Sequence, residues 1–456
     1  MARTFDAIII GAGQAGPPLA GRLTQAGMSV ALIERHLVGG TCVNTGCMPT
    51  KALVASSYAA RIARRGADYG VMLDGAPRID MARVHARSHT ITLDARTGLE
   101  NWMDGMAGLT LIRGHARFTG PHSIDVDGVP LTAPRIFLNV GGRASVPDMP
   151  GVHDIPYLTN TSILDLDSVP DHLVVIGGSY IGLEFGQMFR RFGAQVTIVE
   201  KGPRLVSRED EDVSQAIREI LEAEDIAIVT DANGIAFANA AGGIDVTVRS
   251  SEPPVHASHV LIAVGRTPNT HDLGLDIAGV ETDARGYITV GDDLSTNVAG
   301  IWALGDCNGR GAFTHTAYND FEIVAANLLD GDTRKVSDRI RGYALYIDPP
   351  LGRVGMSETE ARATGRPLLI SKRPMTRVGR AVEKGETLGF MKLVADAETG
   401  KMLGAAILGT GGDEAIHGIL DSMATGAGYD MLRWAVPIHP TVSELIPTLI
   451  GDLRPA

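Results

Sequence analysis

Short apolar runs that end in glycine recur along the first two thirds of the chain. Residues 8–10 read Ile-Ile-Ile and residues 174–176 read Val-Val-Ile, and each run leads into a glycine-rich turn. Continuous apolar runs of this kind are typical of parallel strands that are buried on both faces. A helix-like stretch and a second apolar run follow each turn, so Phe5–Glu34 and His172–Glu200 predict the same strand–helix–strand unit, written twice.

The remaining pattern predicts how these units are completed. Apolar runs at 136–142, 260–265 and 300–306 end in small residues, and a helix-like stretch follows the last run near 317–329. From about Tyr343 the pattern alternates, as in Phe390–Ala395 and Met402–Leu408, which predicts an antiparallel sheet. Helix-like stretches follow near 414–426 and 443–453.

Composition and charge narrow the class of protein. The chain has 456 residues with a net charge of −12, so it lacks the positive charge that binding to nucleic acid or an anionic membrane would need. Only 5% of the residues are aromatic, which argues against platforms for base stacking. No apolar run reaches the ~18 residues of a membrane span, and the apolar run at 8–10 is too short for a signal peptide. Three cysteines (Cys42, Cys47 and Cys307) are too few for a secreted disulfide scaffold, so we expect a cytoplasmic protein.

The first glycine-rich turn has the spacing of a dinucleotide-binding fingerprint. Gly11, Gly13 and Gly16 follow the first apolar run, and Glu34 closes the second. Such glycines allow a tight turn and bring a pyrophosphate close to a helix N-terminus, while the acidic residue accepts hydrogen bonds from ribose hydroxyls. We therefore expect a dinucleotide on this unit.

The second turn departs from that spacing at one position. It reads Gly177-Gly178-Ser179-Tyr180-Ile181-Gly182. Ser179 stands where the second glycine belongs, which leaves slightly less room for a pyrophosphate. Glu200 at the end of the next strand favours a free 2′-hydroxyl and hence NADH, because a 2′-phosphate would meet like charge. Arg204 lies four residues further on and is able to swing toward a phosphate, so NADPH is the alternative.

Two cysteines lie shortly after Glu34, in the segment GGTCVNTGCMPTK (39–51). Cys42 and Cys47 are separated by four residues at the predicted start of a helix, where the N-terminus lowers a thiol pKa and favours the reactive thiolate. A metal site would need more soft ligands than the neighbouring residues supply. We expect a redox-active disulfide and no metal, with the cation of Lys51 one turn beyond Cys47.

His439 and Glu444 form a second candidate constellation. Histidine is the usual acid–base group near neutral pH, and a carboxylate partner fixes its tautomer and raises its pKa. We expect Pro440 to open a helix between the two residues. On its own such a pair is best explained as a helix-capping or core histidine; an acid–base dyad is the alternative, which is favoured once the dithiol elsewhere in the chain is combined with the family resemblance given below.

These motifs resemble those of the flavoprotein pyridine nucleotide–disulfide oxidoreductases, the family of dihydrolipoamide dehydrogenase, glutathione reductase and mercuric reductase. The resemblance covers essentially the whole chain. It rests further on Ala263–Asn269 (AVGRTPN), Gly305-Asp306, Asp348–Glu358 (DPPLGRVGMSE) and His439–Glu444 (HPTVSE). It implies FAD on the first unit, NAD(P)H on the second, and a homodimer made by the C-terminal part.

The resemblance also implies roles for single residues. Cys42 would be the interchange thiol and Cys47 the charge-transfer thiol against the isoalloxazine, with a Lys51–Glu184 ion pair beside the flavin and nicotinamide. His439, with Glu444, would reach Cys42 of the other subunit, so that a monomer would be inactive. The expected FAD-binding residues are Gly11, Gly13, Gly16, Glu34, Gly40, Thr41, Lys51, His115 near the adenine, Asp306 at the ribityl chain, and Ala317. The expected NAD(P)-binding residues are Gly177, Gly178, Tyr180, Ile181, Gly182, Glu184, Glu200 and Gly265.

The expected fold is therefore α/β, with two Rossmann-like dinucleotide-binding domains and a C-terminal α+β dimerisation domain. We expect the FAD-binding domain at 1–150 with a second part at 271–342, the NAD(P)-binding domain at 151–270 and the dimerisation domain at 343–456.

The implied reaction passes hydride from NAD(P)H to FAD and electrons on to the Cys42–Cys47 disulfide, which reduces a small disulfide or thiol-reactive oxidant. The segment TCVNTGCMPTKALVAS is most like that of mercuric-reductase-like members. Two features argue against mercury reduction. The last residues, GDLRPA, lack the cysteine pair with which mercuric reductases collect the ion, and those enzymes generally lack the histidine of the dyad, which this chain has. Mercuric-ion or hypothiocyanous-acid reduction and dihydrolipoamide dehydrogenase activity remain alternatives within the family.

Two hypotheses from other classes stay open at this point. A diaphorase or flavin oxidase would pass electrons to quinones or oxygen without the thiols, and would keep its turnover in Cys42→Ser. A non-catalytic subunit of a larger complex would show no bleaching of flavin absorbance with NADH. Cys307, next to Asp306, is best explained as a small buried residue without a redox role.

Overall fold

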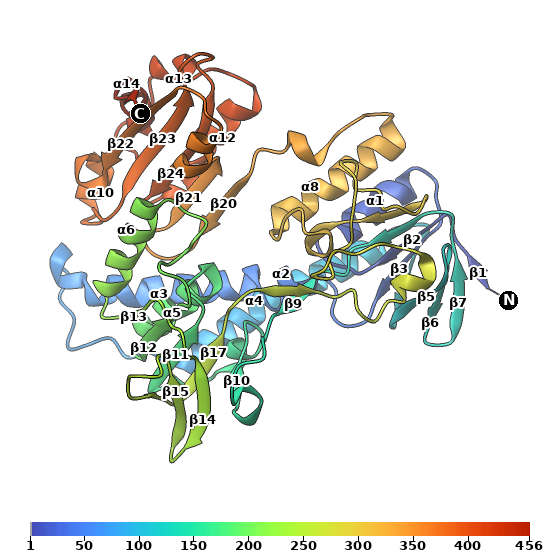
Figure 1. Cartoon of the computed structure of the whole chain (residues 1–456), viewed down its shortest axis with the longest axis horizontal. Helices are drawn as coiled ribbons and strands as arrows, with labels where there is room; N and C mark the ends of the chain where they lie inside the picture. Colours follow the sequence, from blue (N-terminus) through green and yellow to red (C-terminus); the bar gives the residue numbers. More distant parts are fainter. Residues whose placement is uncertain (1) are drawn as a thin grey trace.

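The structure is a computed structural model that describes residues 2–456. Its first sheet has five parallel strands in the order β19-β8-β2-β3-β4. Figure 1 labels β2 and β3 of this sheet, near the N-terminal end of the chain. These strands are β2 (Ala7–Ile10), β3 (Val30–Glu34), β4 (Leu109–Arg113), β8 (Ile136–Leu138) and β19 (Ile301–Ala303).

The central strand β2 is buried on both faces. Ile9 packs among the side chains of α1 (Gly16–Gln25) and α8 (Thr314–Ala325), whereas Ile8 packs among those of a smaller sheet. That sheet consists of β1 (Arg3–Thr4), β5 (Ala116–Gly120), β6 (Ser123–Val126) and β7 (Val129–Thr132), in the order β1-β7-β6-β5. Burial on both faces explains why the strand reads as an uninterrupted apolar run.

The second sheet repeats this arrangement in the middle of the chain. It has five parallel strands in the order β10-β17-β11-β12-β13. They are β10 (Tyr157–Leu158), β11 (His172–Ile176), β12 (Gln195–Val199), β13 (Ala227–Val229) and β17 (His259–Ile262). Helices α5 (Tyr180–Phe192) and α6 (Glu211–Glu222) pack with one face, and β14 (Ala236–Ala240), β15 (Gly243–Thr247) and β16 (Val255–Ala257) with the other.

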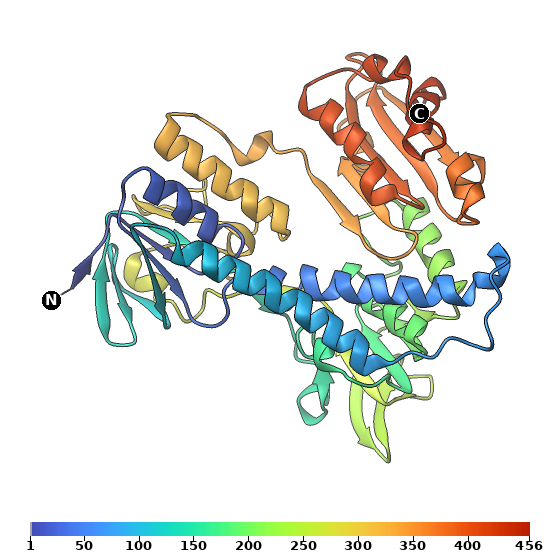
Figure 2. The ribbon, with the colours of Figure 1, turned by 180° about the vertical axis from the view of Figure 1, so that it is seen from behind.

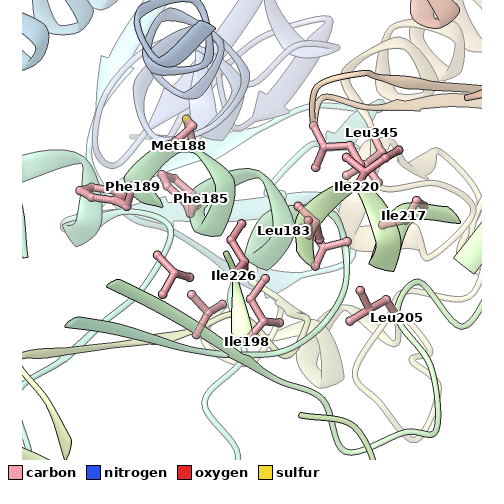
Figure 3. Close-up of a cluster of buried hydrophobic side chains, with 14 of the residues drawn as sticks. Leu183, Phe185, Met188, Phe189, Ile198, Leu205, Ile217, Ile220, Ile226 and Leu345 are labelled. Carbon is pink, nitrogen blue, oxygen red and sulfur yellow. The ribbon is translucent and has the colours of Figure 1, made fainter. Parts of the chain in front are cut away.

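Figure 3 shows the core that forms around α5. Leu183 and Phe185 of α5 belong to one buried cluster with Ile198 of β12, Ile217 of α6 and Leu345. Because Leu345 belongs to the C-terminal part of the chain, this cluster joins the second sheet to that part. Burying such side chains contributes about 1.5–3 kcal/mol each.

The C-terminal part is a six-stranded antiparallel sheet with short helices around it (Figure 1). Its strands are β20 (Gly342–Leu345), β21 (Leu351–Gly355), β22 (Leu368–Pro374), β23 (Phe390–Asp396), β24 (Met402–Leu408) and β25 (Arg454–Pro455), in the order β20-β21-β24-β23-β22-β25. Its helices are α9 (Glu358–Ala363), α10 (Gly379–Glu383), α11 (Gly412–Ala415), α12 (His417–Ala424), α13 (Asp430–Arg433) and α14 (Ile446–Gly451).

Two long helices run side by side across the middle of the molecule (Figure 2). They are α3 (Cys47–Arg64) and α4 (Met81–Asp104), and the short α2 (Gly40–Asn44) precedes them. At the far end of α3, Arg61 donates to Glu224 after α6 at 2.6 Å, and Arg65 just past the helix lies 3.9 Å from Glu386 of the C-terminal part. The helix that begins at Cys47 is thereby anchored to both other parts of the chain.

Buried charges also join the second sheet to the C-terminal part. Glu209 before α6 pairs with Arg353 of β21, and the ammonium of Lys392 on β23 lies 3.2 Å from Asp210 and 2.6 Å from Glu358. Glu209, Asp210, Arg353 and Lys392 are all buried. Each of these four buried charges has a partner of opposite sign, as buried ions require.

The expected fold class is confirmed: two parallel-sheet Rossmann-like domains precede a C-terminal α+β domain. The link between the two parallel-sheet parts is β9 (Gly142–Ala144), which pairs with β18 (Arg266–Pro268), and α7 (Leu275–Ala278) follows. The apolar run at 136–142 contains all of β8, which ends at Leu138, and the first residue of β9; Gly141, between the two strands, has a positive φ of 66°. None of the helices within residues 2–456 combines the length and apolar character that a membrane crossing requires.

The expectation that Pro440 opens a helix between His439 and Glu444 is wrong. The first helical turn in this region is a 3₁₀ turn at Ser443–Leu445. The hydroxyl of Thr441 donates to the carbonyl of Ile438 at 2.7 Å and accepts from the N–H of Glu444 at 3.2 Å. Such local side-chain hydrogen bonds satisfy the backbone in a turn and compete with helix formation.

Candidate active site

A cavity of about 1110 Å³ lies where the first two domains meet. It is lined by the first glycine-rich turn, the cysteine segment, the start of α5 and the start of α8. The expected site residues that line it are Gly11, Gly13, Glu34, Gly40, Thr41, Cys42, Cys47, Lys51, His115, Tyr180, Ile181, Glu184, Asp306 and Ala317. The expected residues that do not line it are Gly16, Gly177, Gly178, Gly182, Glu200, Gly265, His439 and Glu444.

The first glycine-rich turn has the shape that a pyrophosphate needs. Gly11 has a φ of 104°, and a Cβ atom there would lie 2.3 Å from the carbonyl oxygen of Asn139; a Cβ atom on Gly16 would lie 2.3 Å from that of Gly11. No side chain caps the N-terminus of α1. Pro17 and Pro18 have no N–H, and the N–H of Gly16 donates to the carbonyl of Gly13 at 3.1 Å, so the positive end of the helix dipole rather than free helical N–H groups would attract an anion here. With its tight glycine turn, this end of the cavity fits a dinucleotide.

Glu34 and Glu200 hold their turns in the same way. The carboxylate of Glu34 accepts from the N–H of Ala12 at 2.9 Å and of His36 at 2.8 Å. That of Glu200 accepts from the N–H groups of Gly178 and Gly202, both at 2.7 Å. Each carboxylate is fixed at the end of its second strand, where it can meet a ribose.

The second turn repeats the constraints of the first. Gly177 has a φ of 119°, and a Cβ atom there would lie 2.3 Å from the carbonyl oxygen of Ala263, while one on Gly182 would lie 2.1 Å from that of Gly177. No side chain caps α5 either. From the sequence, Arg204 was a candidate to contact a 2′-phosphate. In the structure it donates to the carbonyl of Ser207 at 3.2 Å.

The cysteine pair lies at the junction of two helices. Cys42 belongs to α2 and Cys47 is the first residue of α3, and both are free thiols, as is Cys307. A hydrogen bond from Cys42 lowers the pKa of Cys47 to about 6, and the same contact raises the pKa of Cys42. Thr314 and Lys51 lower the pKa of Cys47 further. When the pair is reduced, Cys47 is therefore the better thiolate of the two.

Lys51 and Glu184 approach each other across the cavity. The Nζ of Lys51 lies 2.6 Å from Oε2 of Glu184 and 4.6 Å from the centre of the Tyr346 ring. The other carboxylate oxygen of Glu184 accepts from the N–H of Tyr346 at 3.0 Å. Glu184 is buried, so this carboxylate and ammonium hold a fixed position one helical turn from Cys47.

Asp306 and His115 lie along other stretches of the cavity wall. Burial raises the pKa of Asp306, and Arg266, whose Nε lies 3.3 Å from this carboxylate, opposes the shift. Nε2 of His115 lies 3.1 Å from the carbonyl oxygen of Asp272. Cys307 next to Asp306 is fully buried, and burial raises its thiol pKa to about 12. A thiol with that pKa is poorly suited to redox chemistry near neutral pH.

His439 and Glu444 come together, but neither belongs to the cavity wall. Nδ1 of His439 lies 2.8 Å from Oε2 of Glu444, and the histidine side chain is 79% exposed. Large apolar side chains are exposed in the preceding segment, with Trp434 at 80%, Val436 at 95% and Ile438 at 80%. Exposed apolar side chains in such number are characteristic of an interaction surface.

Sequence reasoning missed several cavity residues. Thr314 at the start of α8 has its hydroxyl 3.3 Å from Sγ of Cys47, and Phe313 and Tyr346 line the wall beside it. A threonine and an aromatic residue directly before a predicted helix carry no distinctive spacing, so only the fold reveals them. In the part of the chain that the structure describes, no three His, Cys, Asp or Glu side chains gather as a metal would require.

Comparison with known proteins identifies the family to which this chain is similar. Residues 5–320 match the family described as pyridine nucleotide-disulphide oxidoreductase, and residues 342–450 match its dimerisation domain. Among curated relatives, the probable pyridine nucleotide-disulfide oxidoreductase RclA of Escherichia coli is 34% identical over 99% of both chains. A mercuric reductase of Bacillus cereus is 32% identical over 96% of this chain and 70% of that protein, and a dihydrolipoyl dehydrogenase of Thermus scotoductus is 31% identical over 97% and 96%.

The fold also agrees with a solved structure. The HOCl-induced flavoprotein disulfide reductase RclA from Escherichia coli, solved as a Cu(II) complex, superposes with a TM-score of 0.89 at 33% identity, over 98% of this chain and 99% of that one.

Proposed function

Because this chain belongs to the pyridine nucleotide-disulphide oxidoreductases, we propose that its Cys42–Cys47 pair passes electrons from NAD(P)H to a small thiol-reactive oxidant. The chain is an FAD-dependent oxidoreductase that uses NAD(P)H. The observation that supports this role for the pair is the position of both sulfurs on the wall of one cavity, together with Lys51, Glu184 and the first glycine-rich turn.

The residues fit the two cofactors by their chemistry. The uncapped N-terminus of α1 and Glu34 would hold the pyrophosphate and a ribose of FAD, and the start of α5 with Glu200 would do the same for NADH. We propose NADH rather than NADPH, because the Glu200 carboxylate would repel a 2′-phosphate. When bound, FAD supplies the two-electron chemistry that connects NADH to the disulfide.

The chain's own groups carry out the steps at sulfur. Two electrons cleave the disulfide and leave Cys47 as the thiolate and Cys42 as the interchange thiol. His439 of the partner subunit takes the proton of Cys42, and the Cys42 thiolate attacks the electrophilic sulfur of the acceptor. A new S–S bond forms, the bond from that sulfur to the leaving group breaks, and the leaving group takes the proton back from His439 of the partner subunit. The Cys47 thiolate then attacks the Cys42 sulfur, which closes the disulfide and releases the reduced acceptor as an anion.

We propose hypothiocyanous acid as the representative acceptor. Attack of the Cys42 thiolate on its sulfur would release water, once the leaving hydroxide is protonated, and attack of Cys47 would release thiocyanate. Two observations favour an oxidant of this class: the relative that matches over the full length of both chains is described as HOCl-induced, and the described residues contain only one cysteine outside the pair, Cys307, which is buried. Dihydrolipoamide is the second candidate, because a His–Glu dyad is present beside an exposed apolar surface.

Homodimerisation would complete the site. The dimerisation domain matches at 342–450, and the exposed apolar side chains before His439 are those that a second copy would cover. We place the reaction in the cytoplasm, because a dithiol that works in its reduced form suits a reducing compartment.

The test is an anaerobic titration of the FAD-loaded enzyme with NADH and with NADPH. One equivalent of NADH should reduce the disulfide and produce a long-wavelength charge-transfer band, and rapid turnover should follow with hypothiocyanous acid but not with mercuric ion. Cys42→Ser and Cys47→Ser should abolish turnover. Full turnover in Cys42→Ser would instead identify a diaphorase, and preference for lipoamide in the acceptor panel would identify a dihydrolipoamide dehydrogenase.

A further inference from the structure

Two consecutive residues, Phe313 and Thr314, contact the second glycine-rich turn and Cys47 respectively. The ring of Phe313 lies with its centre 5.7 Å from that of Tyr180, the first residue of α5 in the second glycine-rich turn. The hydroxyl of the next residue, Thr314, lies 3.3 Å from Sγ of Cys47. The dipeptide therefore bridges the nucleotide-binding turn and the thiol.

We propose that Phe313 and Thr314 couple occupancy of the NAD(P)H site to the protonation of Cys47, with Thr314 as a positioning residue for the thiolate and Phe313 as the link to Tyr180. This inference rests on the proposed function of Cys47 as the thiol beside the flavin.

Among the groups that face Cys47, Thr314 is the one whose distance to the sulfur can change most easily. The groups that face this sulfur are Cys42 on α2, Lys51 on α3, Thr314 on α8 and Tyr346 before β21. Lys51 is held by Glu184 and by the Tyr346 ring, and Cys42 is set by the short helix α2. A hydroxyl that donates to a thiolate stabilises the charged form and so lowers the thiol pKa, and at 3.3 Å a small displacement weakens that contact.

Phe313 is held on the sides away from Tyr180. The Tyr343 ring stacks on it at 5.8 Å and 6°, and the Tyr343 hydroxyl donates to the buried Glu209. The His315 ring stacks on it at 5.4 Å, and Nε2 of His315 lies 2.8 Å from the carbonyl oxygen of Gly342. Both stacking partners are anchored, so among the rings beside Phe313 the Tyr180 ring is the one that a bound nucleotide can move.

The expected direction of the coupling follows from this packing. Tyr180 lines the cavity at the start of α5, where a bound nicotinamide nucleotide must contact it. A nucleotide that moves the Tyr180 ring moves Phe313 with it, and Thr314 then withdraws from Cys47. The pKa of Cys47 should therefore rise when nucleotide binds. The positive charge of NAD⁺ alone would lower it.

The experiment uses the FAD-loaded Cys42→Ser enzyme, in which Cys47 is the only thiol on the cavity wall and no reductant is needed. Its charge-transfer absorbance is titrated with pH, without and with saturating NAD⁺, and the pH dependence of Cys47 alkylation by iodoacetamide provides an independent readout. We expect NAD⁺ to raise the midpoint by about half a pH unit. By linkage, NAD⁺ should then bind about threefold more weakly above the midpoint than below it.

Single substitutions distinguish the contribution of Thr314 from that of Phe313. In the same background, Thr314→Val should raise the nucleotide-free midpoint by about one pH unit, the size of one hydrogen bond to a thiolate, and Thr314→Ser should restore it. Phe313→Leu should keep FAD bound but remove the NAD⁺-induced shift. Trp102→Leu, which truncates an exposed aromatic residue on α4, serves as the matched control and should leave both values unchanged.

The two proposals fail in different ways. If Cys42→Ser enzyme loaded with FAD shows no charge-transfer band at any pH, Cys47 does not lie against the flavin and the proposed function is wrong. If the band is present but NAD⁺ leaves its midpoint unchanged or lowers it, or if the shift persists in Phe313→Leu, the coupling is wrong while the proposed function stands.

Discussion

Nζ of Lys51 and Oε2 of Glu184 are 2.6 Å apart, although the first residue lies on the helix that begins at Cys47 and the second on the helix of the second glycine-rich turn. The pair joins the sulfur chemistry to the nucleotide-binding domain. The glutamate is buried and the lysine is partly exposed, so the two partners are not equivalent.

Removal of the lysine should harm both stability and rate. Lys51→Met leaves a buried carboxylate with only the N–H of Tyr346, so we expect the free energy of unfolding to fall by about 2 kcal/mol and reduction by NADH to slow by about a hundredfold. Adding Glu184→Leu should recover most of the stability but none of the rate. Stopped-flow reduction and denaturant unfolding would measure the two effects, with the exposed Lys335→Met as control. Equal losses in the single and double variants would contradict this account.

The reduced enzyme should gain stability as pH rises. The pKa of Cys47 is lowered to about 6 from an ordinary thiol value of 9.0. A lowered folded-state pKa contributes stability that is fully present above the unfolded value and is lost as pH falls through the folded value. Between pH 9 and pH 6 the melting temperature of the dithiol-reduced protein should therefore decline because of this group. Differential scanning calorimetry of wild type against Cys47→Ser tests this, and parallel curves for the two proteins would refute it.

Nucleotide preference should depend on Glu200. Its carboxylate is fixed by the N–H groups of Gly178 and Gly202, so a 2′-phosphate cannot push it aside without breaking both contacts. Glu200→Gln keeps an acceptor oxygen and removes the charge, and we expect the ratio of kcat/KM for NADPH over NADH to rise about tenfold. Steady-state kinetics with both nucleotides would measure it. Glu211→Gln, at an exposed position on α6, should leave the ratio unaltered, and an unchanged ratio in Glu200→Gln would reject the proposed discrimination.

The dyad should act across the dimer. His439→Gln should lower turnover by about a hundredfold or more, since an acid–base group is lost. Cys42→Ser chains should be inactive for a different reason, because they lack the proposed interchange thiol. Co-expression of the two variants should yield heterodimers in which one site has both an intact Cys42 and an intact His439, so activity should reappear. A mixture no more active than its parents would show that His439 does not serve the other subunit.

The sequence could predict what has a periodic or fixed spacing. The buried runs around Ile8–Ile10 and Val174–Ile176, the glycine spacing and the terminal Glu34 and Glu200 all follow from local rules, so the two parallel-sheet units were predictable. The proximity of Cys42 and Cys47 on the cavity wall was likewise predictable, because both cysteines belong to one short stretch of chain.

Other parts depended on contacts between distant segments. Thr314 reaches Cys47 only because β19 brings the start of α8 to the cavity, and the orientation of Arg204 toward Ser207 depends on its local loop. The turn at His439 was mispredicted, because Thr441 satisfies the backbone by its own hydroxyl, a competition that a proline signal alone does not reveal.

Helix α3 starts at Cys47 on the cavity wall, carries Lys51 one turn later and ends near the Arg61 and Arg65 anchors. Each residue of an α-helix adds about 1.5 Å of length and about 100° of rotation. A single insertion or deletion between Cys47 and Arg61 would therefore turn the anchors away from Glu224 and Glu386, or turn the sulfur away from the cavity. Substitutions at positions of this helix other than Cys47, Lys51 and the anchors can be tolerated one by one, but a change in the number of its residues cannot.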